Sequence, residues 1–84
     1  MDSDTLLAEL YLTHRKPLLE YARRLTGDPH RAEDVVQETL LRAWLHAATL
    51  WVDQPSAIRA WLYRVTRNIA VDDARATRAR PTEV

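Results

Sequence analysis

The chain contains a single glycine, and an aspartate and a proline follow it directly. Gly27 has no Cβ, so it readily takes the left-handed conformation that ends a helix. Asp28 is a good N-cap residue, and Pro29 suits the first position of a new helix. These three residues predict that one helix ends and the next begins without a long loop. The 84 residues contain only three other prolines and no other glycine. Because these residues are typical of turns, long helices are favoured over a sheet with many turns.

Hydrophobic periodicity predicts three helices. The first spans about residues 4–25, and Pro17 is expected to break or kink it because proline has no amide hydrogen to donate. The second runs over about residues 29–46. The third covers about residues 56–78, with its first residue, a serine, as the N-cap. Residues 47–55 are expected to form a loop.

Each helix carries an apolar stripe at the spacing of an α-helix. The stripes are Leu7, Leu10, Tyr11, Leu18, Tyr21, Ala22 and Leu25 in the first helix, Ala32, Val35, Val36, Thr39, Leu40, Ala43 and Ala47 in the second, and Ile58, Trp61, Leu62, Val65 and Ile69 in the third. They predict an all-α fold, a compact bundle of three main helices, in a domain spanning residues 1–80. Pro81 lies beyond the last helix, so residues 81–84 are expected to begin a linker.

The second helix has a polar face opposite its apolar stripe, and that face also holds two leucines. It consists of Asp34, Gln37, Glu38, Leu41, Arg42 and Leu45. An apolar centre with a charged rim is typical of a small protein-docking patch, which would be centred on Leu41 and Leu45. Single exposed leucines are also common on surfaces that bind nothing, so periodicity leaves both interpretations open.

Positive charge is concentrated near the end of the chain, although the formal net charge is zero. Residues 56–84 hold six arginines and three acidic residues. Within the third helix, one side carries Arg64, Arg67, Arg75 and Arg78, bordered by Tyr63 and Asn68. Arginines at helical spacing beside an aromatic ring can follow a phosphate backbone and contact bases. The alternative interpretation is that these arginines form an ordinary solvated face that binds no nucleic acid.

The sequence gives no support for catalysis or for a cofactor. There is no cysteine, and the three histidines lie far apart, so no metal site is predicted. One glycine cannot build a glycine-rich phosphate loop, and no spacing suggests a Ser, His and Asp set, so we predict that the chain is not an enzyme. No apolar run is long enough for a membrane span, and the acidic N-terminus does not resemble a signal peptide. A cytoplasmic protein is expected.

Three blocks of this sequence, in the same order, resemble the second conserved region of the extracytoplasmic-function sigma factors of bacterial RNA polymerase. Residues 28–44 contain an acidic residue, two apolar residues and Gln-Glu-Thr, followed by Arg-Ala and an aromatic. Residues 59–68 are similar to the family's strand-separating and promoter-reading helix, and residues 19–28 match the helix that precedes the first block. The resemblance covers about residues 5–80.

The resemblance implies a partner for each exposed face. The clamp helices of the polymerase β′ subunit would contact Asp34, Gln37, Glu38, Leu41, Arg42 and Leu45. Single-stranded non-template DNA of the minus-ten promoter element would contact Trp51 and Asp53 in a base-capturing loop, and Tyr63, Arg64, Arg67, Asn68, Arg75 and Arg78 in the third helix. The expected function is to bind core polymerase, recognise this promoter element and help to melt it. An anti-sigma factor is a further expected partner.

Two features depart from the family pattern. Residues 50–52 are Leu-Trp-Val where many relatives have polar residues, so a base preference cannot be transferred. The family also has a helix-turn-helix domain, which we expect beyond Val84. The alternative function is a small helical interaction adaptor that uses Leu41 and Leu45 and binds no DNA. A helix-turn-helix repressor is disfavoured because its recognition-helix spacing and tight glycine turn are missing.

Overall fold

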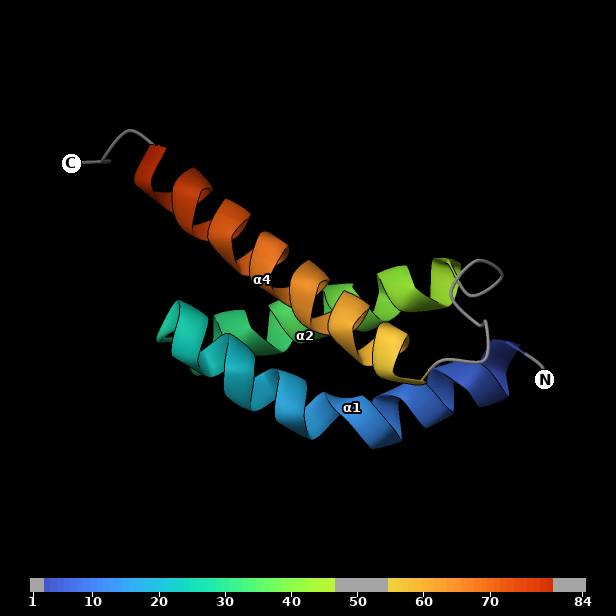
Figure 1. Cartoon of the computed structure of the whole chain (residues 1–84). Helices are drawn as coiled ribbons and strands as arrows, with labels where there is room; N and C mark the ends of the chain where they lie inside the picture. Colours follow the sequence, from blue (N-terminus) through green and yellow to red (C-terminus); the bar gives the residue numbers. More distant parts are fainter. Residues whose placement is uncertain (1–2, 47–54, 80–84) are drawn as a thin grey trace.

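The computed structural model describes residues 3–46 and 55–79, which form three α-helices (Figure 1). Helix α1 spans Ser3–Thr26, α2 spans Pro29–Leu45 and α4 spans Pro55–Ala79. Each helix packs against the other two, and the last turns of α4 extend beyond its neighbours in this view (Figure 1). The all-α prediction is confirmed, and every element in the described ranges is helical.

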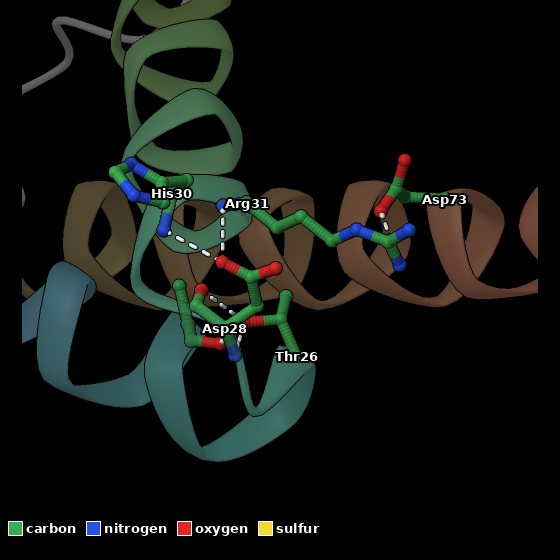
Figure 2. A network of polar contacts seen from close by, with 6 residues as sticks. Thr26, Asp28, His30, Arg31 and Asp73 are labelled. Carbon is green, nitrogen blue, oxygen red and sulfur yellow. Dashed lines mark hydrogen bonds and ion pairs between the residues drawn. The ribbon is translucent and has the colours of Figure 1, made fainter.

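The junction between α1 and α2 forms as its sequence predicts. Gly27 has a φ of 67°, and its amide donates to the carbonyl of Arg23 at 2.8 Å, which ends α1. The Asp28 carboxylate accepts hydrogen bonds from the amides of His30 at 2.8 Å and Arg31 at 3.3 Å (Figure 2). These two amides have no partner within α2, so the carboxylate stabilises the start of the helix. The same hydrogen bonds lower the pKa of Asp28.

Helix α1 passes through Pro17 without a break, so a break at this position is wrong, while the alternative expectation of a kink stays a prediction. Proline removes a single amide donor and leaves the rest of the hydrogen-bond ladder available. The core holds the helix on both sides of this position, because Leu10 and Leu18 are both buried. Tertiary packing of this kind outweighs a local cost in helix formation.

The core lies where the three apolar stripes meet. It contains Leu10, Leu18 and Ala22 from α1, Ala32, Val35, Val36, Leu40 and Ala43 from α2, and Leu62, Ile69 and Ala70 from α4. Two threonines are buried among them. The Thr66 hydroxyl lies 2.8 Å from the Leu62 carbonyl and 3.1 Å from the Thr39 hydroxyl, which donates to the Val35 carbonyl. This pair joins α2 to α4 without leaving a buried hydroxyl unsatisfied.

The boundaries of the predicted stripes need correction. Tyr11 and Leu25 were expected in the core but are 50% and 39% exposed. Trp61 is only half-buried and packs at the edge of the core, whereas its neighbour Leu62 is fully enclosed. Helix α4 begins at Pro55, so Ser56 lies inside the first turn and is not the N-cap. Proline fits that first turn because its missing amide hydrogen would have had no partner there.

Candidate functional site

The polar face of α2 points away from the core, as predicted. All six of its residues are exposed: Asp34, Gln37, Glu38, Leu41, Arg42 and Leu45. Leu41 is 49% exposed and Leu45 is 66% exposed, so neither contributes to the folded core. Glu38 and Arg42 form a one-turn ion pair at 2.8 Å beside them. An exposed pair of this kind adds little stability, which leaves both charged groups available to a partner.

Two grooves flank this face of α2. The groove against α1 has a volume of about 410 Å³, and its lining comprises Tyr11, Arg15, Glu33, Val36, Gln37, Leu40 and Leu41. The groove against α4 has a volume of about 330 Å³, and its lining comprises Arg31, Asp34, Val35, Glu38, Arg42, Ile69, Asp72, Asp73 and Ala76. The candidate docking face is therefore a ridge, with one mainly apolar groove and one mainly charged groove beside it.

An ion pair at each groove ties α2 to a neighbouring helix. One Nη of Arg15 in α1 donates to both carboxylate oxygens of Glu33 at 2.9 Å. Arg31 at the start of α2 lies 3.7 Å from Asp73 in α4 (Figure 2). These side chains are at least one-third exposed, so each pair adds little to the stability of the fold.

The outer face of α4 carries the predicted basic stripe. Arg64, Arg67, Asn68 and Arg75 are exposed, and Tyr63 is half-buried beside them. None of these three arginines forms an ion pair with any residue in the described part of the chain. Arg78 lies in the last turn of α4, but its side chain is outside the described set. The available guanidinium groups make this face suitable for phosphates.

The predicted base-capturing residues, Trp51 and Asp53, lie outside the described residues. That these two residues capture a base stays a prediction. The structure gathers the α2 face and the α4 face around one core.

Sequence reasoning missed contacts made between helices. Arg15 of α1 pairs with Glu33 of α2, and the Tyr21 ring of α1 lies 5.1 Å from the Tyr63 ring of α4, measured between ring centres. Leu12, at 81% exposure, adds an apolar side chain outside the predicted stripe. Periodicity along one helix identifies which face a residue occupies, but it carries no signal for a partner on another helix.

The described residues contain no cluster of His, Cys, Asp and Glu that could hold a metal ion. His14 is half-buried between α1 and α4, where burial, and then the charge of Arg59, lowers its pKa. His46 caps the end of α2 and contacts the Arg42 carbonyl at 2.8 Å. Within the described helices, none is long and apolar enough to cross a membrane.

The chain is similar in sequence to known sigma factors. The sigma-70 region 2 family model matches residues 10–80. The ECF RNA polymerase sigma factor SigL of Mycobacterium tuberculosis is 51% identical over 75 residues, which cover 89% of this chain and 42% of the relative. SigG of the same species is 43% identical, covering 81% of this chain and 18% of the relative. SigM of Bacillus subtilis is 33% identical, covering 80% of this chain and 39% of the relative. The chain thus spans less than half the length of these relatives.

Proposed function

Because the chain belongs to the extracytoplasmic-function group of the sigma-70 family, we propose that it binds core RNA polymerase and opens promoter DNA. In this proposal α2 docks on the clamp helices of the β′ subunit. The outer face of α4 holds the non-template strand of the minus-ten element. The chain would work with polymerase in the cytoplasm and catalyse no reaction itself.

The observation that carries the proposal is that two dissimilar faces are exposed on helices that share one core. Helix α2 presents Leu41 and Leu45 within a charged rim, while α4 presents Arg64, Arg67 and Arg75 without described acidic partners. The apolar centre suits a protein partner and the guanidinium groups suit a nucleic acid. Because each helix buries its opposite side in the same core, both faces can be occupied at once.

Promoter opening would be driven by binding energy. Separating the strands costs a few kcal/mol for each base that is unstacked, and contacts with the released base and its backbone offset this cost. Phosphate contacts from α4 would set the position of the strand without selecting its sequence. Sequence choice would come from Asn68, Trp51 and Asp53, as the family resemblance implies.

The polymerase half of the proposal is tested by Leu41→Asp. We expect this change to abolish most of the capture of a β′ clamp-helix fragment, because a charge would be placed at the apolar centre of the contact. Leu25→Asp is the matched control, since Leu25 is also a partly exposed leucine but lies on α1. The circular-dichroism spectrum of Leu41→Asp should be unchanged. Equal capture by Leu41→Asp and the unchanged chain would contradict docking through this face.

An anti-sigma factor would compete for one or both of these faces. The exposed leucines of α2 also fit the alternative, a protein-interaction adaptor without DNA binding. The two functions differ in their response to single-stranded DNA. The sigma domain should bind it at low salt, whereas an adaptor would leave it unbound at every salt concentration.

A further inference from the structure

Aromatic and cationic side chains gather where α1 packs on α4. The Tyr21 and Tyr63 ring centres lie 5.1 Å apart, with the ring planes at 54°. The Arg59 guanidinium lies over the Tyr63 ring, 5.7 Å from its centre. Arg59 is exposed, while both tyrosines are half-buried and Tyr63 packs on the core. We name these three residues the Arg59 cluster. It presents an exposed guanidinium plane supported by rings that the core holds in place.

The charge at this cluster is positive. Arg59 forms no ion pair with any residue in the described ranges. On α1, His14 responds to this charge, because burial and then the charge of Arg59 lower its pKa. The Arg59 guanidinium is always protonated and therefore carries the positive charge of this cluster. Positive charge beside aromatic rings is the combination that single-stranded nucleic acids bind.

The cluster continues the basic stripe of α4. Arg59, Tyr63 and Arg67 are spaced four residues apart, so they lie one above the other on one side of the helix. Eight residues of α-helix rise about 12 Å, roughly three nucleotide steps of a stacked strand. A strand held by Arg67 can therefore reach Arg59 without leaving this side of the helix.

We infer that the Arg59 cluster is a stacking platform for an unpaired base of the DNA strand that the α4 stripe holds. The base would lie on the exposed face of the Arg59 guanidinium, with Tyr63 and Tyr21 behind it. This inference rests on the proposed function, and it adds a residue of α1 to the DNA site. A stacking contact accepts every base, so the platform would anchor the strand without selecting its sequence.

The test separates a planar stacking surface from a positive charge. We would titrate a dye-labelled oligodeoxythymidine with the chain at low salt and follow fluorescence anisotropy. Arg59→Lys keeps the charge but loses the guanidinium plane, so affinity should fall about two- to fivefold, as for an exposed cation–π contact. Arg23→Lys is the matched control, because Arg23 is exposed on the side of α1 opposite to Tyr21, and its affinity should not change.

The tyrosine ring is tested by a pair of variants at one position. Tyr63→Leu keeps apolar packing on the core and removes the ring, so affinity should fall about fivefold or more. Tyr63→Phe keeps the ring, so it should bind several times more tightly than Tyr63→Leu. Circular dichroism establishes that each variant is folded. If Arg59→Lys binds like the unchanged chain, or if folded Tyr63→Leu binds like Tyr63→Phe, the platform is refuted.

Failure of this inference can be told apart from failure of the proposed function. If replacement of Arg67 and Arg75 weakens binding and the Arg59→Lys change does not, the strand follows α4 but does not stack on the cluster. If the unchanged chain fails to bind the oligonucleotide even at low salt, the DNA half of the proposed function is refuted together with the platform.

Discussion

Replacing Arg67 and Arg75 by alanine should make DNA binding less sensitive to salt. Both side chains are exposed on α4 and neither has an acidic partner among the described residues, so both are available to phosphates. Each phosphate neutralised on a single strand contributes about −0.7 to the slope of log affinity against log salt concentration. Four contacts, from these two residues with Arg64 and Arg78, predict a slope of about −3. Loss of the two contacts from Arg67 and Arg75 should reduce the steepness of this slope by about 1.4.

The assay is a set of anisotropy titrations with labelled single-stranded DNA at several salt concentrations. It should be repeated with core polymerase present, because polymerase would supply further contacts with the strand. The matched control removes the same amount of charge from another helix. Lys16→Ala with Arg23→Ala serves this purpose, because both residues are exposed and lie seven residues apart on one side of α1.

Two results would refute the reasoning. An unchanged slope in the Arg67 and Arg75 variant would show that neither side chain neutralises a phosphate. An equal loss of slope in the Lys16 and Arg23 control would show that only the net charge of the chain matters. Loss of affinity should also be similar for different DNA sequences, because phosphate contacts do not specify bases.

Two further predictions concern stability. Leu62→Ala should lower the free energy of unfolding by about 2–5 kcal/mol, because Leu62 is fully enclosed at the meeting point of the helices. Urea titrations measure this, and a loss as small as that of Leu45→Ala, at an exposed site, would show that the core is elsewhere. Asp28→Asn should reduce the loss of stability in acid. The pKa of Asp28 is lowered in the folded chain, so its carboxylate stabilises the fold above pH 3.8, the ordinary pKa of the group, and this stabilisation is lost as the pH falls below 3.8. Thermal melts measured at pH values from neutral to about 2 check this, and identical pH profiles for both proteins would contradict it.

Features that depend on near neighbours along the chain could be predicted from the sequence. The stop and start at Gly27, Asp28 and Pro29 could be predicted because capping involves groups within a few residues of one another. The outward face of α2 could be predicted for a similar reason, since 3.6 residues per turn fix which side chains lie opposite a buried stripe. The three blocks of family resemblance are also read directly along the chain.

Features that depend on a neighbour from another helix could be found only in the folded structure. Pro17 stays within α1 because packing on both sides holds the helix, and Tyr11 is exposed because the core does not extend over it. The pairing of Arg15 with Glu33 and the contact between the Tyr21 and Tyr63 rings each join two helices, so periodicity along either helix treats the partners as independent. A helical repeat gives the direction of each side chain from its own axis, whereas the crossing of two helices determines which side chains meet.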